Sequence, residues 1–101
     1  MKPLDRYKWI IRHMKDNGDA EGERFDVLRK SFVDAYVEAT GAKATQTLIG
    51  ANKCRLLGKD LSQMHRAGYL FQSRLWISDN FASDFGLPKW VYQYWVHREI
   101  R

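Results

Sequence analysis

The chain has 101 residues, and 17 Lys and Arg against 12 Asp and Glu give it a formal net charge of +5. This length fits one small domain and excludes a large two-domain enzyme. The single cysteine excludes a disulfide framework within the chain, and a content of 45% hydrophobic and 14% aromatic residues excludes a disordered protein. No apolar run approaches the roughly 18 residues of a transmembrane helix, and residues 1–18 lack the apolar centre of a secretory signal, so we expect a cytoplasmic protein.

The positive charge is concentrated in one stretch of the sequence. Residues 1–41 contain eight basic and eight acidic side chains, and residues 77–101 contain three of each. Residues 42–76 contain six basic side chains and one acidic side chain, so the whole net charge of +5 arises there. A concentrated positive field attracts polyanions, and phosphate neutralisation dominates the affinity of proteins for nucleic acids. The alternative is a solvated basic face on a protein whose partner is neutral.

Two amphipathic helices are predicted in the first part of the chain. The first covers residues 1–17, where apolar side chains follow at helical spacing: Leu4, Tyr7, Ile10 or Ile11, and Met14. This helix either adds to the core or supplies a homodimer contact through Trp9 and Ile10. The second is predicted over residues 23–40, with Phe25, Leu28 and Phe32 on its apolar face. Gly41 occupies the position of a helix-terminating glycine.

The basic stretch is predicted to form a short helix and then a longer one. Thr45 suits an N-cap, and the short helix covers residues 45–51. The longer helix covers residues 53–67 and ends at Gly68. Its apolar stripe consists of Leu57, Leu61 and Met64, and the opposite side carries polar and basic residues.

After Gly68 the apolar period changes from helical to alternating, which is typical of a strand. Residues 90–96 are aromatic and β-branched, a composition that suits a second strand. Turn-forming residues separate the two segments, so we expect an antiparallel hairpin over residues 69–97. The predicted fold is mainly α with a C-terminal β-hairpin, that is α+β, in one domain covering residues 1–101.

The segment LGKDLSQMHRAGYL, residues 57–70, resembles the end of the recognition helix and the start of the first wing strand in winged helix-turn-helix domains. The apolar residues Leu57, Leu61 and Met64 and the Ala67-Gly68 pair carry the resemblance, which covers about residues 23–97. It implies a winged helix-turn-helix fold with an extra N-terminal helix, and a recognition helix over residues 53–67 in the major groove of double-stranded DNA. It further implies a small transcriptional regulator of prokaryotic or phage type, associated with the nucleoid.

The DNA-contacting residues are expected on the two helices of the basic stretch and on the first strand. Arg55 is the candidate for bidentate contact with guanine, because its planar fork matches the O6 and N7 acceptors. The start of the short helix is expected to hold a phosphate. The full set of candidate DNA-binding residues is Lys43, Thr45, Gln46, Thr47, Lys53, Arg55, Lys59, Ser62, Gln63, Arg66 and Arg74.

The loop between the two strands favours a different partner. Asp79 and Asp84 make it acidic, so phosphates would repel its tip, and its apolar residues are expected to fold back on the core. One alternative function is therefore a protein–protein interaction module that uses the aromatic hairpin and this acidic loop. Others are an excisionase-like or replication accessory DNA-binding factor, and single-strand binding by stacking on Trp76 or Trp90.

Catalytic motifs are not evident in the sequence. His13, His65 and His97 lie far apart and lack the spacing of metal ligands. Cys54 has no base at a known motif spacing and is expected to be a small buried residue. We therefore expect neither an enzyme nor a bound metal or cofactor.

Overall fold

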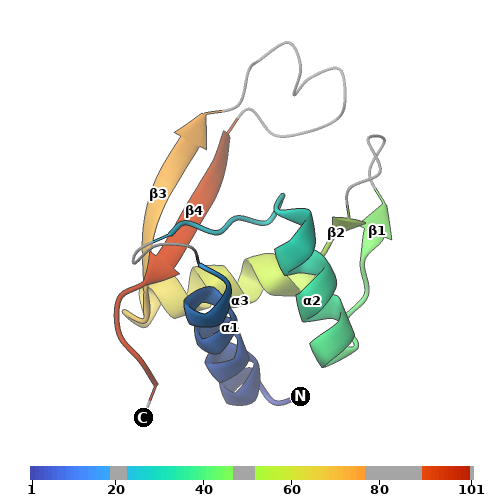
Figure 1. The fold of residues 1–101 in the computed structure, drawn as a ribbon, viewed down its shortest axis with the longest axis horizontal. Helices are drawn as coiled ribbons and strands as arrows, with labels where there is room; N and C mark the ends of the chain where they lie inside the picture. Colours follow the sequence, from blue (N-terminus) through green and yellow to red (C-terminus); the bar gives the residue numbers. More distant parts are fainter. Residues whose placement is uncertain (19–22, 47–51, 77–89, 101) are drawn as a thin grey trace.

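The computed structural model describes residues 1–18, 23–46, 52–76 and 90–100. These residues form three helices and two pairs of antiparallel strands, which confirms the expectation of a small α+β fold with a C-terminal hairpin. In chain order the elements are α1 (Pro3–Asn17), α2 (Lys30–Thr40), β1 (Thr45–Gln46), β2 (Asn52–Lys53), α3 (Arg55–Arg66), β3 (Leu70–Trp76) and β4 (Trp90–Val96) (Figure 1).

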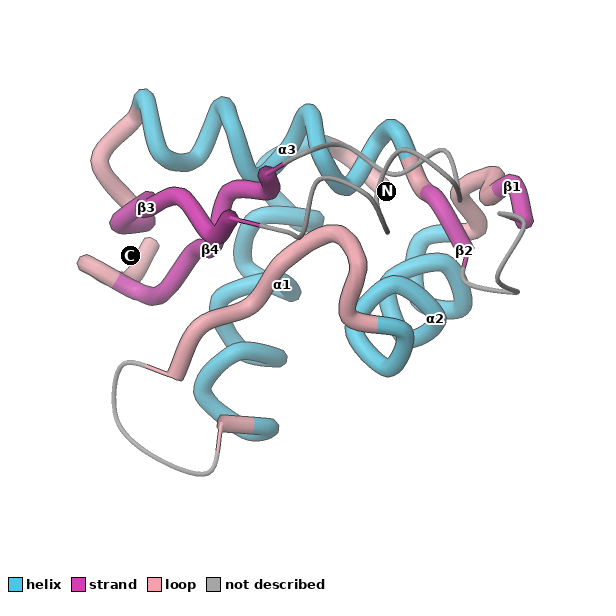
Figure 2. Tube along the Cα trace, turned by 90° about the horizontal axis from the view of Figure 1, so that it is seen from above, coloured by secondary structure: helices cyan, strands magenta, loops and turns pink. Residues whose placement is uncertain are grey.

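The core lies between the three helices and the end of the β3–β4 hairpin at which Leu70 pairs with Val96. Its largest fully buried side chains come from α1, α2, α3, the segment before α2, and β3: Ile10, Phe25, Phe32, Val33, Tyr36, Leu57, Leu61, Met64 and Leu70. Figure 2 shows α3 along one edge of the molecule, with α1 and α2 both on the same side of it. One long side of α3 is therefore left uncovered by the other described elements.

Helix α1 is a full member of this core. Ile10 is completely buried, and Ile11 and Met14 are almost so. Trp9 is half-buried, stacked on His13 at a centroid distance of 4.9 Å. The expectation that Ile10 lies on the surface for a homodimer contact was wrong, and the homodimer itself stays a prediction. The alternative that this helix adds to the core is confirmed, because its apolar face belongs to the core cluster.

Helix α2 begins at Lys30, not near residue 23 as predicted. Residues before it run beside β4, where Phe25 and Tyr94 exchange two backbone hydrogen bonds of 2.8 Å. The Asp26 carboxylate then accepts a hydrogen bond from the backbone N–H of Leu28, which forms a turn. Phe25 satisfies a helical apolar period, but the pairing with β4 determines its backbone conformation.

The predicted short helix over residues 45–51 is not seen at its first two residues, which are the part of it that the structure describes. Thr45 pairs with Lys53, and Gln46 pairs with Asn52, in a small antiparallel ladder. Residues 47–51 lie outside the described residues. A helix of two turns gains few hydrogen bonds to offset its nucleation, so cross-strand pairing of a β-branched residue such as Thr45 prevails here. Lys53 consequently belongs to β2, and α3 starts two residues later than expected.

The hairpin and the joint that leads into it match the prediction closely. Strands β3 and β4 pair from Leu70 opposite Val96 to Trp76 opposite Trp90. Helix α3 ends at Arg66, and Gly68 follows the C-cap residue Ala67 with a φ of 86°, a conformation that favours glycine. The N–H of Gly68 donates to the carbonyl of His65, and that of Tyr69 donates to Met64. These two bonds form a Schellman motif, so the turn from α3 into β3 has one defined geometry.

Candidate nucleic-acid interface

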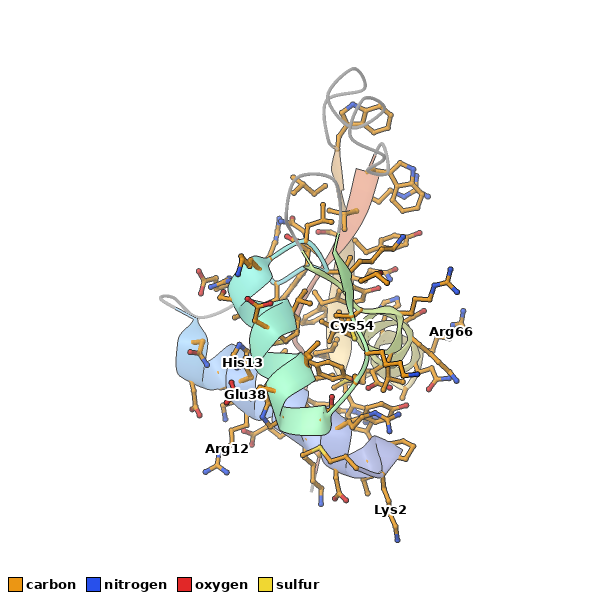
Figure 3. The ribbon with its side chains drawn as sticks, turned by 90° about the vertical axis from the view of Figure 1, so that its right-hand side faces the viewer. Lys2, Arg12, His13, Glu38, Cys54 and Arg66 are labelled. Atoms are coloured by element: carbon orange, nitrogen blue, oxygen red, sulfur yellow. The ribbon has the colours of Figure 1, made fainter. Side chains whose placement is uncertain are left out.

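Helix α3 has two contrasting faces. Leu57, Leu61 and Met64 are fully buried against the core, as the spacing predicts. The opposite face carries Arg55, Lys59, Gln63 and Arg66, all of which are exposed. In Figure 3, Arg66 extends away from the body of the molecule, on the side opposite Arg12 and Glu38. The sequence pattern therefore identified both the helix and the face that it presents.

The six basic residues of the stretch 42–76 all lie at the surface. They come from the segment before β1, from β2, from α3 and from β3: Lys43, Lys53, Arg55, Lys59, Arg66 and Arg74. None of them takes part in an ion pair within the described part of the chain. Unpaired cations contribute their full field to the solvent, so this stretch offers an attractive surface for a polyanion.

The single acidic residue of the same stretch is hidden. Asp60 is only 1% exposed, on the inner side of α3. Its carboxylate accepts hydrogen bonds from Nε and Nη2 of Arg6 at 2.8 and 3.1 Å, and from the hydroxyl of Tyr36 at 2.6 Å. Burial, together with this hydrogen bond, raises the pKa of the Tyr36 hydroxyl. The negative charge is neutralised inside the protein and does not weaken the field of the basic face.

Sequence reasoning missed the role of Asp60, because both partners are remote in the chain. A buried carboxylate needs a cation and further donors to offset its desolvation. Arg6 lies on α1 and Tyr36 on α2, so the three groups join all three helices at one point. The only available signal was an acidic residue on the apolar side of an otherwise amphipathic helix, next to Leu57 and Leu61.

The N-terminal end of α3 concentrates positive charge. Lys53 precedes the helix, Arg55 opens it, and the first turn contains no acidic residue. The free N–H groups there already carry about half a positive charge, so helix stability alone would favour Asp or Glu at these positions. The observed residues add to the dipole instead. This arrangement suits an anion that approaches the first turns of the helix.

The remaining polar candidates for DNA contact differ in their exposure and in their hydrogen bonds within the protein. The exposed Thr45 lies opposite Lys53 in the β1–β2 ladder, so the two share one face. Gln63 accepts a hydrogen bond of 2.7 Å from the hydroxyl of Tyr7, which leaves its amide N–H₂ as a donor. Ser62 is half-buried. Gln46 lies in β1, and Thr47 lies outside the described residues.

Gly58 does not face the basic side of α3. A Cβ atom placed on Gly58 would lie 3.9 Å from Cγ1 of Val27, which is ordinary van der Waals contact toward the core. The missing side chain of Gly58 therefore does not bring the basic face closer to a DNA backbone.

The hairpin contributes one cation within the described residues. Arg74 lies over the ring of Trp90, with 4.9 Å from Cζ to the ring centroid. The loop containing Asp79 and Asp84, together with Phe81, Phe85 and Leu87, falls outside the described residues, so its expected behaviour stays a prediction.

Other kinds of site were sought in the same part of the chain. Among the described residues, no three His, Cys, Asp or Glu side chains come together as metal ligands. Cys54 is buried at the start of α3. No described helix combines the length and apolarity needed to span a bilayer.

Comparison with protein-family models, with curated proteins and with solved structures revealed no match to this chain.

Proposed function

We propose that this protein binds double-stranded DNA through the exposed face of α3. The observation that carries the proposal has two parts: six cations of residues 42–76 are exposed and form no ion pair with another described residue, and the only acid of that stretch, Asp60, is buried. A helix of 12 residues with one free face fits the major groove, and Lys and Arg along it neutralise phosphates.

Sequence-specific recognition, as in a small transcriptional regulator, rests on the resemblance of residues 57–70 to winged helix-turn-helix domains. Three helices and an antiparallel hairpin that follows α3 directly are compatible with such a domain. In this proposal α2 takes the place of the helix before the recognition helix, and β1 and β2 form the connection between them. Fold analogy alone does not establish a regulatory role, so specificity needs its own test.

The proposal assigns separate roles along α3. Arg55 and Lys59 are one turn apart and share a face, so both enter the groove together. Arg55 donates to guanine through its planar fork. The free amide of Gln63 is available to an acceptor on a base or phosphate. Arg66 and Lys53 contact phosphates at the two ends of the helix.

The test measures binding to a mixed pool of duplexes by fluorescence anisotropy while salt rises from about 50 to 200 mM. Affinity should fall steeply, and the Arg55→Ala/Lys59→Ala variant should lose affinity and reduce the salt slope by about two. The matched control is Lys8→Ala/Arg12→Ala, which removes the same charge from α1. Figure 3 shows Arg12 on the side opposite Arg66, and Lys8 is one turn away from it.

Equal loss of binding in both variants would show a nonspecific charge effect and would overturn the assignment of α3. Selection of bound sequences from a random DNA pool then tests specificity. A shared consensus is expected, and a palindromic one would indicate a dimer on paired half-sites.

The competing proposal, a protein-interaction module, is favoured by one observation. Three of the exposed large hydrophobic residues lie on β3: Phe71, Leu75 and Trp76. Binding to DNA that changes little with salt, or its absence in the wild-type protein, would favour this function over the first.

A further inference from the structure

One face of the hairpin changes character along its length. Leu70 and Tyr94 are buried on the face that packs against the core. Side chains alternate along a strand, so Arg74 and Trp76 on β3 lie on that same face, farther from the joint with α3. There the face is no longer covered: Trp76 is 64% exposed, the highest value among the large hydrophobic residues of the described chain. Figure 1 shows this far half of the hairpin rising clear of the helices.

The exposed end of this face is an ordered aromatic cluster. Trp76 lies directly opposite Trp90 in the ladder, and Arg74 lies opposite Tyr92. The ring of Trp90 has the Arg74 guanidinium 4.9 Å from its centroid and the ring of Tyr92 at 4.8 Å in an edge-on arrangement. These two contacts orient the ring of Trp90, which lies across the ladder from Trp76. The indole of Trp76 is the most accessible flat apolar surface of the cluster.

The charge around this cluster selects its partner. Among the described residues of the hairpin, Arg74 is the charged side chain, and it is exposed on the same face as Trp76 and Trp90. A nucleic acid offers the indole a flat π face and offers the neighbouring Arg74 a phosphate. Bases stack on aromatic side chains without regard to sequence, and arginine adds a favourable charge interaction.

We propose that Trp76 stacks on an unpaired base, so that the protein prefers duplex DNA with a single-stranded extension over blunt duplex. This inference rests on the proposed binding of duplex DNA by α3. In the joint complex α3 occupies the groove, Arg74 contacts the backbone, and the first unpaired base lies on Trp76. A base inside the duplex cannot serve, because both of its faces are occupied by its neighbours in the stack.

The experiment compares three probes by fluorescence anisotropy at one salt concentration: a blunt duplex, the same duplex with an extension of about six nucleotides, and the extension alone. The extended duplex should bind about tenfold more tightly than the blunt one, the effect of stacking one base. Tryptophan emission should be quenched more by the extended duplex. Trp76→Ala should abolish both differences and leave the affinity for blunt duplex unchanged, while Trp76→Phe should keep much of the preference.

Leu75→Ala is the matched control. Leu75 is 41% exposed, adjacent in sequence, and on the opposite face of the hairpin, so its loss should leave the preference intact. Equal affinity of the wild-type protein for blunt and extended duplexes, or an unchanged preference in Trp76→Ala, would overturn the inference and leave the proposed function standing. Absence of binding to either duplex would overturn the proposed function and this inference with it. Equal loss in Leu75→Ala and Trp76→Ala would overturn the inference in favour of a general effect of apolar surface.

Discussion

The guanidinium of Arg6 holds the carboxylate of Asp60 through two hydrogen bonds, 2.8 and 3.1 Å long, between residues 54 positions apart. Arg6 is 14% exposed and Asp60 is 1% exposed. The interaction therefore joins α1 to the buried side of α3, the helix whose other side is proposed to enter the DNA groove. The orientation of the basic face depends on this internal ion pair.

Replacing Arg6 should destabilise the protein strongly. In Arg6→Leu the buried Asp60 carboxylate loses its cation, and removing one member of a buried pair costs about 3 kcal/mol. The free energy of unfolding, measured by urea denaturation, should fall by this amount. The matched control is Lys30→Leu, which breaks the exposed pair between Lys30 and Asp34 at the same 2.8 Å separation. There the loss should stay below about 0.5 kcal/mol. Similar losses in the two variants would contradict the importance of burial at Asp60.

Replacing Gly58 by alanine should stabilise α3. The position is helical, and the added Cβ would make an ordinary contact with Val27 at 3.9 Å. Alanine exceeds glycine in helix propensity by about 1 kcal/mol, so the melting temperature should rise by roughly 4–8 °C. Affinity for duplex DNA should stay the same, because this Cβ points toward the core. A lower melting temperature would show that the space beside Val27 is smaller than the structure indicates.

The stability of the protein should decrease as the pH falls through the range of His13. Its ring stacks between Trp9 and Phe32, and partial burial, followed by the charge of Arg29, lowers the histidine pKa below its ordinary value of 6.5, whereas Asp16 opposes the shift. The unfolded chain then binds the proton more readily than the folded one. The contribution of neutral His13 to the free energy of unfolding is therefore fully present above pH 6.5. It is lost as the pH falls from there through the lower pKa of the folded state.

Urea denaturation at several pH values between about 6.5 and 5, above the range in which most carboxylates titrate, measures this loss. His13→Phe keeps an aromatic ring in the stack and removes the titration, so its stability should change less over the same range. An identical pH dependence in the wild type and the variant would assign the effect to other groups.

Alanine substitutions at Gly41 and Gly68 distinguish the cost of backbone strain from the cost of displacing a neighbouring side chain. Both have positive φ, 71° and 86°. A Cβ at Gly41 meets nothing within 4 Å, whereas at Gly68 it would lie 3.3 Å from Nη2 of Arg98. Gly41→Ala should therefore cost only the left-handed conformation, about 1 kcal/mol, and Gly68→Ala should cost more. Thermal melts of both variants test the order, and Gly68→Ala with Arg98→Ala should recover part of the difference. A larger loss at Gly41 would contradict this account.

The spacing of apolar residues and glycines predicted the elements that depend on interactions within one segment of the chain. The stripe of Leu57, Leu61 and Met64 is buried as its spacing requires, and Gly41 and Gly68 end their helices as predicted. The alternating residues of β3 and the aromatic residues of β4 pair as the expected hairpin. These features depend on the intrinsic geometry of helices, glycines and strands, which a sequence displays directly.

Contacts between remote residues account for what the sequence did not reveal. Phe25 fits a helical period, yet its backbone bonds to Tyr94 near the other end of the chain keep it out of α2. From the sequence, Asp60 is an isolated acid in a basic stretch. Its buried position is explained only by its hydrogen bonds to Arg6 and Tyr36, which are remote in the chain. Within the candidate site, exposure of Arg55 and Lys59 followed from helical spacing, whereas engagement of Gln63 by Tyr7 depended on how α1 packs.

The Schellman turn at Gly68 fixes the orientation of β3 relative to α3. Arg98 reinforces that orientation, because its Nη2 atom donates to the carbonyl of Ala67 at 2.8 Å. The distance between the backbone positions of Arg66, before the turn, and Arg74, after it, is consequently fixed. In the proposed DNA complex, inserting a single residue at the turn would shift the two cations relative to the repeat of the phosphate backbone without removing either charge.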